Sequence, residues 1–196
     1  IKRKAGIFFN VKISLFDKES QKKIIAAAPA AYPKLNINIS AGKRRQKVAG
    51  SSYMKSNLVS VSVKIKNPAR DIDLPKCRFT IILIGRNSRR YADKNLDWSK
   101  ILSIQKFETA IQASKEYSRE LQPITTKYDS DKDSSNLGGW EYDGYLLIIQ
   151  KPDGGILKAK SSIGPLKTTV VDNPTLLEKA LGLSENTELN RDFTAL

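Results

Sequence analysis

The chain has 196 residues, with 34 Lys or Arg, 20 Asp or Glu and no His, and its formal net charge is +14. Its hydrophobic fraction of 40%, spread in short runs, is enough to bury a core and argues against global disorder. The absence of His removes the commonest general base and metal ligand, and the single cysteine, Cys77, excludes an intramolecular disulfide.

Alternation of apolar and polar residues marks the strands of the first half. Residues 7–15, IFFNVKISL, alternate in the manner of a half-buried strand. Residues 24–34 form an Ala-rich link interrupted by prolines. The alternation returns at 35–40, and the basic run after Gly42 either continues that strand or bulges out of it. It is clearest at 58–66, LVSVSVKIK, where we expect one face to be buried: Val59, Val61, Val63 and Ile65.

Strands also dominate the middle of the chain. Residues 78–84, RFTIILI, are almost continuously apolar, which indicates a central strand covered on both faces. Cys77 precedes them and is expected to be a small buried hydrophobe. Further strands are predicted at 100–108 and 124–128, whereas residues 110–121 suit either a strand or a helical turn.

A hairpin and a helix are predicted toward the end of the chain. Residues 140–150 and 156–161 are strand-like and flank Lys-Pro-Asp-Gly-Gly at 151–155, a sequence typical of a turn. A short helix is expected at 174–183. Its signals are Asn173 as the N-cap, Pro174 at the first position and Gly182 as the stop.

This succession of seven or eight short strands favours an all-β, antiparallel sandwich with a short C-terminal helix. An OB-like barrel is the alternative. We divide the chain into an N-terminal strand and Ala/Pro-rich link at 1–34, a β-sandwich domain at 35–172, and a C-terminal helix and tail at 173–196. No apolar run reaches the roughly 18 residues that a membrane span needs.

The positive charge is concentrated in the first half of the chain. Residues 1–90 carry 21 Lys or Arg against 4 Asp or Glu, a balance of +17, while the remainder has a balance of −3. Such a half favours an anionic partner: an acidic glycan, an acidic protein, an anionic lipid surface or nucleic acid. The alternative is that these residues are solvated strand faces. The candidate anion-binding residues are Lys43, Arg44, Arg45, Lys47, Arg86, Arg89 and Arg90.

Asp129, Asp131 and Asp133 have the D-x-D-x-D spacing of a calcium loop, in which alternate carboxylates converge on one cation. Ser134 and Trp140 stand where an EF-hand needs Gly and Glu, and Lys132 lies among the candidate ligands. These three residues are therefore weak metal candidates, with a solvated acidic loop as the alternative. No cofactor is expected.

Catalytic motifs do not rise above chance. The S-x-x-K matches lack a companion motif, and no phosphate-binding glycine loop occurs. Glu141 and Asp143 share one face of a predicted strand, which keeps a carboxylate-based hydrolase as an alternative. Aromatic residues that could stack on bases, such as Trp98 and Trp140, lie in the near-neutral half, so a nucleic-acid-binding β domain ranks behind other anionic partners.

Three segments of the chain resemble a family of secreted verrucomicrobial β-sandwich proteins. These segments are the basic run from Lys43, the V-x-V-x-I-x-N strand at 61–67, and the aromatic strand and hairpin from Trp140 to Ser162. In mucin-degrading gut bacteria, proteins of this kind are encoded near type IV pilus-like genes and have an immunoglobulin-like fold. The resemblance covers about three-quarters of the chain and implies an immunoglobulin-like sandwich.

The resemblance also implies a non-enzymatic binding or structural protein at the cell surface, associated with pilus-like assemblies or with host interaction. Residues 24–31 end like a signal-peptidase site, but no apolar segment precedes them, so they do not form a signal peptide. We expect a secreted or cell-envelope protein whose leader is removed before Ile1, and a cytoplasmic location is the alternative.

Overall fold

A computed structural model describes residues 17–20, 32–50, 52–91, 98–190 and 193, with the side chains of 90 and 91 left out. The chain divides into two compact units, Ile1–Tyr32 and Pro33–Leu196. The expected strand at 7–15 and most of the expected link at 24–34 lie outside the described residues. Everything that follows concerns the unit Pro33–Leu196.

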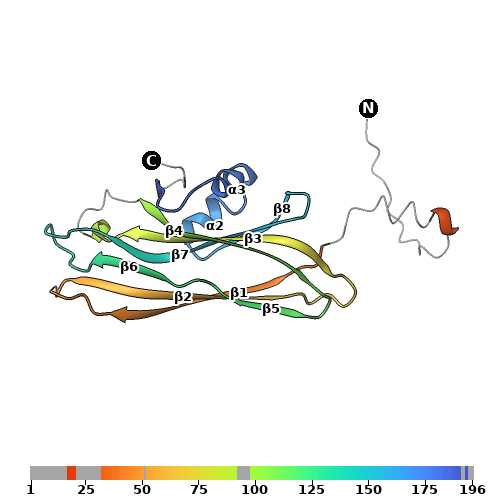
Figure 1. Ribbon diagram of the computed structural model, residues 1–196. Helices are drawn as coiled ribbons and strands as arrows, with labels where there is room; N and C mark the ends of the chain where they lie inside the picture. Colours follow the sequence, from red (N-terminus) through yellow and green to blue (C-terminus); the bar gives the residue numbers. More distant parts are fainter. Residues whose placement is uncertain (1–16, 21–31, 51, 92–97, 191–192, 194–196) are drawn as a thin grey trace, which may run out of the picture. The chain divides into compact units, whose positions relative to one another are not determined.

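This unit is built from two antiparallel sheets, so the all-β prediction is confirmed at that level (Figure 1). In the smaller sheet, β2 pairs along one side with β1 and along the other with β5 and β6. The larger sheet has the order β8-β7-β3-β4-β9. Because the strands form two sheets rather than one closed sheet, the OB-like alternative is not what the structure shows. The strands are β1 (Asn36–Gln46), β2 (Met54–Lys66), β3 (Leu74–Asn87), β4 (Ser99–Ile111), β5 (Glu116–Glu120), β6 (Ile124–Asp129), β7 (Trp140–Gln150), β8 (Ile156–Ser161) and β9 (Glu188–Leu189).

One core lies between the sheets. Val59, Val61, Val63 and Ile65 of β2 are fully buried, as the alternation predicted. They face the larger sheet, where Phe79 of β3 stacks on Phe107 of β4 at a ring-centroid distance of 5.0 Å. Phe107 stacks in turn on Tyr117 of β5 at 5.7 Å, so one aromatic row crosses from the larger sheet to the smaller.

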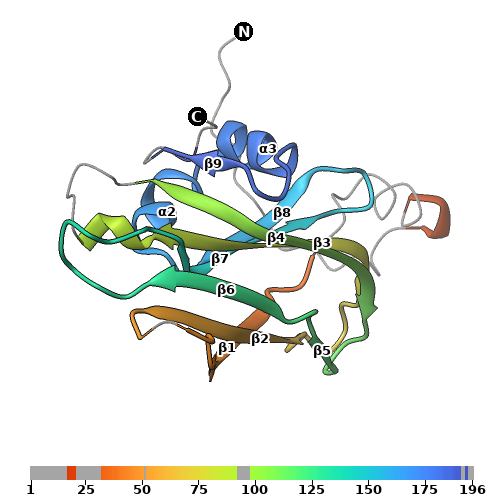
Figure 2. The same cartoon turned by 60° about the vertical axis from the view of Figure 1, so that its left-hand side comes forward.

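A second core lies on the far side of the larger sheet, under α2 (Gly164–Thr169) and α3 (Pro174–Leu181) (Figures 1 and 2). Alternate residues of β3 point to the two cores, because successive side chains of a strand face opposite ways. Ile82 and Ile84 lie under the helices, while Ile81 and Leu83 have the opposite orientation. The prediction of a central strand covered on both faces is thus confirmed, and Cys77 at its start is buried.

Local signals explain the ends of α3. The Asn173 side chain accepts a hydrogen bond from the N–H of Leu176, Pro174 occupies the first turn, and Gly182 is the C-cap. The hairpin of β7 and β8 also forms as predicted, with the N–H of Lys151 bonded to the carbonyl of Gly155. No described helix is both long and apolar enough for a bilayer span.

The structure also settles two segments that the sequence left open and adds one short helix. The basic run after Gly42 continues β1 to Gln46 rather than bulging out of it. The ambiguous residues 110–121 form the end of β4, a turn and β5. After β3 the chain enters a 3-10 helix, η2 (Ser88–Tyr91), which the sequence analysis did not predict.

Candidate anion-binding site

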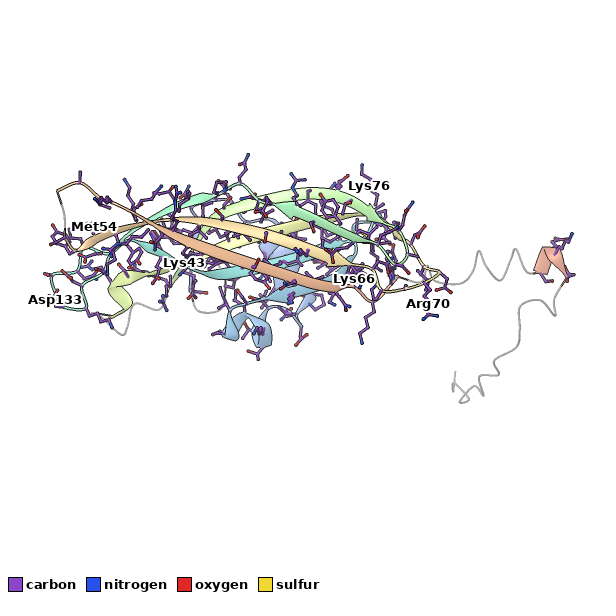
Figure 3. All side chains as sticks on the ribbon, turned by 90° about the horizontal axis from the view of Figure 1, so that it is seen from below. Lys43, Met54, Lys66, Arg70, Lys76 and Asp133 are labelled. Atoms are coloured by element: carbon purple, nitrogen blue, oxygen red, sulfur yellow. The ribbon has the colours of Figure 1, made fainter. Side chains whose placement is uncertain are left out.

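The hairpin between β1 and β2 carries a basic groove. The groove has a volume of about 700 Å³ and no Asp or Glu among its lining residues, which are Arg45, Gln46, Lys47, Val48, Ala49, Ser52 and Met54. Figure 3 shows Met54 and Lys43 toward one end of the sandwich and Lys66 and Arg70 at the other. We call the first of these the hairpin end.

Three of the predicted cations are exposed at the hairpin end: Arg44, Arg45 and Lys47. None of them forms an ion pair with any residue that the structure describes. Arg45 and Lys47 line the groove, whereas Arg44 lies opposite Leu58, a position whose side chain points away from the other sheet. That outer face also carries Lys127 of β6, two strands away, which the sequence analysis did not single out.

Two other predicted cations, Lys43 and Arg86, are held in a charge cluster with carboxylates. Arg86 Nη2 lies 2.9 Å from Glu141 Oε2, and Arg86 Nη1 lies 3.8 Å from Asp143 Oδ1. Lys43 Nζ lies 3.3 Å from Glu141 Oε1 and also donates to the carbonyl of Tyr142 at 3.0 Å. The structure therefore joins these two cations to each other through Glu141, and their charge is largely balanced locally.

A β-bulge in β7 lies where the two carboxylates approach Arg86. Gly144 pairs with Ile84 and Tyr142 pairs with Gly85, so that Asp143 is the extra residue. Such an insertion re-aims a side chain. Glu141 and Asp143 are two residues apart, so alternation already places them on one face of β7, and the bulge adjusts the position of Asp143 relative to Arg86.

The ionisation of Glu141 follows from this cluster. Burial opposes ionisation, but the hydrogen bond from Arg86 and the charge of Lys43 outweigh it, and the pKa of Glu141 lies below its usual value. A general acid would need a raised pKa. The cluster stabilises an ionised Glu141 and does not prepare it to donate a proton.

Stability should therefore depend on pH through Glu141. A lowered folded-state pKa gives stability that is present above the unfolded pKa of about 4.3 and is lost as the pH falls through the folded value. Glu141→Gln should cost about 1–2 kcal/mol of unfolding free energy at pH 7. Urea unfolding at pH 7 and pH 3 measures this difference. A cost at pH 3 as large as that at pH 7 would contradict the ion-pair account.

Of the remaining candidates, Arg89 is exposed on η2 and its aliphatic carbons approach Gly138 in the β6–β7 loop. Its backbone N–H donates to the side-chain oxygen of Asn87. The side chain of Arg90 lies outside the described residues. Arg89 thus borders the acidic loop rather than lining the hairpin groove.

In the acidic loop, Asp129 to Asp133, the carboxylates of Asp129 and Asp133 accept hydrogen bonds from backbone N–H groups. Asp129 is buried and accepts from the N–H groups of Asp131 and Leu137 at 2.9 and 2.8 Å. Asp133 is exposed and accepts from the N–H and hydroxyl of Ser135. Over the described ranges, no three acidic or thiol side chains are grouped closely enough to hold a metal ion. The observed role of Asp129 is to organise the loop, and the metal site stays a prediction from spacing.

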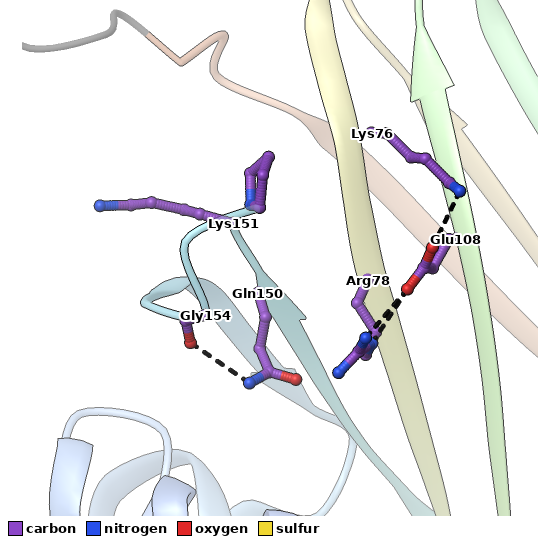
Figure 4. Close-up of a pocket in the computed structure, with 7 residues that line it drawn as sticks. Lys76, Arg78, Glu108, Gln150, Lys151 and Gly154 are labelled. Atoms are coloured by element: carbon purple, nitrogen blue, oxygen red, sulfur yellow. Dashed lines mark hydrogen bonds and ion pairs between the residues drawn. The ribbon is translucent and has the colours of Figure 1, made fainter.

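A second basic concavity of about 300 Å³ lies on the larger sheet, beside the β7–β8 turn (Figure 4). Lys76, Arg78 and Lys151 line it together with a single carboxylate, Glu108. Lys76 and Arg78 each lie 3.1 Å from Glu108. Glu108 pairs with two of the three cations and places a carboxylate inside this concavity, which would repel an anion, whereas no Asp or Glu lines the hairpin groove.

Comparisons with known proteins give only weak structural likenesses. No protein-family model and no curated protein matches the chain. A solved structure from Akkermansia muciniphila, a verrucomicrobial protein, is 12% identical over 86% of this chain and 91% of that one, with a TM-score of 0.26. An RmlC-like cupin protein from Ralstonia eutropha is 13% identical over 74% of this chain and 87% of that one, with a TM-score of 0.14. Likenesses at this level assign neither a detailed fold nor a function.

Proposed function

We propose that this protein is a non-enzymatic, secreted or cell-surface binding module with an immunoglobulin-like sandwich, and that its hairpin end holds an acidic glycan. The observation that carries the proposal is the grouping of Arg44, Arg45 and Lys47, exposed and without a carboxylate partner among the described residues, around a groove lined by no acid. Association with a pilus-like assembly or with host mucin would place such a module where acidic glycans occur.

The same features favour a glycan over nucleic acid. Recognition of single-stranded nucleic acid relies on exposed aromatic rings on which bases stack. Trp98 and Trp140 are only half-exposed, and Lys100 Nζ lies 5.7 Å from the centre of the Trp140 ring. No aromatic residue lines the hairpin groove, and Tyr53 beside it, which is 40% exposed, is a single ring rather than a row of stacking aromatics. Its charge and aliphatic lining suit a flexible sulfated or carboxylated chain.

Charge reversal at the hairpin end should abolish this binding. In Arg44→Glu/Arg45→Glu/Lys47→Glu, retention on immobilised heparin or mucin should fall at least tenfold, because the interaction is electrostatic. Wild-type retention should weaken steeply with added salt, since the Debye length at physiological ionic strength is about 8 Å. Retention is measured at 50 mM and 300 mM NaCl, with double-stranded DNA as a third matrix.

The matched control reverses three exposed cations, Lys64, Lys66 and Arg70, and should retain binding. Figure 3 shows Lys66 and Arg70 at the end opposite the hairpin end. Equal losses in the two variants would mean that binding follows net charge alone. Wild-type retention on neither heparin nor mucin at low salt would reject the glycan proposal. Retention on DNA alone would favour the nucleic-acid alternative.

A further inference from the structure

The outer edge of β1 presents backbone groups that none of the described strands covers. β1 pairs with β2 along its whole length, and on its other side Lys158 and Lys160 of β8 donate to the carbonyls of Leu35 and Ile37. In an antiparallel pair, alternate residues direct both backbone groups to the same side. The N–H and C=O groups of Ile39 and Ala41 therefore also point away from β2, and no described residue forms a hydrogen bond with them.

The apolar layer between the sheets ends one strand short at this edge. Ile37 and Ile39 face inward but stay half-exposed, and Ala41, on the same face, is exposed. Their partners on β2 are fully buried: Ile65, Val63 and Val61. One further strand beside β1, with apolar side chains facing inward, would cover Ile39 and Ala41.

The basic residues at the end of β1 indicate which side chains the rest of an added strand would carry. Beyond Ala41, the residues on the inward face are Lys43 and Arg45, opposite Val59 and Asn57 of β2. Arg45 forms no ion pair with a described residue, so a strand running beside it would need an acidic residue opposite it. Lys43 already contacts Glu141, and a second acidic residue on the added strand would share its ammonium. Open strand edges are templates for strand addition, in which backbone bonds give affinity and alternate side chains give specificity.

We propose that the edge of β1 from Ile39 to Arg45 binds an extended segment of a partner protein as an added antiparallel strand. The segment carries acidic residues at two alternate positions, followed by apolar residues at the next two. The acidic side chains lie beside Arg45 and Lys43, and the apolar ones lie beside Ala41 and Ile39. The part of β1 open to an added strand ends before Ile37, because the Lys160 ammonium donates a hydrogen bond to the Ile37 carbonyl.

A synthetic heptapeptide tests the proposal: Glu-Ser-Glu-Ser-Val-Thr-Val, acetylated and amidated. It should bind the whole protein saturably in an NMR titration. Upon binding, the amide protons of Ile39, Ala41 and Lys43 should exchange at least tenfold more slowly with solvent. The amides of Ser40 and Gly42, which face β2, should change little. Absence of binding, or slowing that does not alternate along β1, would overturn the proposal.

N-methylation separates strand addition from charge attraction alone. The N–H groups of the two valines donate to β1 in the proposed pairing, so methylating both should weaken binding at least tenfold. Methylating the second serine and the threonine, whose N–H groups face away, should be tolerated. Equal affinities for the two methylated peptides would show that no added strand forms.

On the protein side, Ala41→Pro removes an outward N–H at an edge position where proline is tolerated, and Ala41→Lys places an inward charge on the edge. Both should weaken peptide binding at least tenfold while far-UV circular dichroism stays unchanged. Unweakened binding by either folded variant would contradict the assignment of the edge. Both variants should keep heparin retention, so this proposal and the glycan proposal fail independently.

Discussion

Gly139→Val is expected to lower the free energy of unfolding by about 3–5 kcal/mol, from strain at positive φ combined with overpacking. Gly139 has φ +111°, and a Cβ atom there would lie 2.6 Å from both the Lys127 carbonyl oxygen and the Tyr128 Cα. Those contacts are backbone atoms and cannot rotate away. Gly139 bridges to Tyr128 and accepts a hydrogen bond from Ser88, so it fixes the passage from the smaller sheet into β7.

Urea unfolding of wild type and variant measures this loss. Gly154→Ala is the matched control, since Gly154 also has positive φ, +88°, but nothing lies within 4 Å of a Cβ there. It should cost only the conformational strain, about 1 kcal/mol. Similar costs at the two glycines would mean that the backbone does not approach Gly139 closely.

Phe79→Ala is expected to cost about 3–5 kcal/mol, because it opens a cavity in the core between the sheets. Phe79 is fully buried, and its ring is nearly parallel to that of Phe107, which itself stacks on Tyr117 of the other sheet. Removing the first ring leaves Phe107 without a partner on one face. For a domain of this size each kcal/mol lowers Tm by about 2–4 °C.

Calorimetry or thermal circular dichroism gives the Tm of the Phe79 variant. Leu137→Ala is the comparison, because Leu137 is a large apolar residue that is 70% exposed. Its truncation should change stability by no more than about 0.5 kcal/mol. If the two substitutions proved equally mild, Phe79 would not lie in a packed core.

The fold was predictable where a segment carries its own periodic signal. The alternation from Val59 to Ile65 identifies one buried face, and the apolar run of β3 identifies a strand buried on both faces, because burial alone determines these patterns. α2 was not predicted, since Ile163 at its N-cap makes no side-chain capping bond and the helix is a single short segment. β9 has two residues, too few to show any period.

The candidate site was less predictable, because charges in a sequence do not reveal their partners. Lys43 and Arg86 are 43 positions apart, and only the packing of β1 against β7 shows that both contact Glu141. The bulge at Asp143 likewise depends on register with β3. Lys127 is the single basic residue of β6, so its sequence gives no charge cluster. Its position on the same outer face of the smaller sheet as Arg44 follows from the pairing of β6 with β2.

The alternation of strand pairs between the two sheets bears on how the chain folds. The chain gives two strands to the smaller sheet, two to the larger, two more to the smaller, and then the rest to the larger. Neither sheet is a continuous stretch of sequence, and β3 can meet β7 only after the segment with β5 and β6 has closed between them. High contact order of this kind slows folding. It also makes unfolding cooperative, because no cut between β3 and β6 leaves either fragment with a complete sheet.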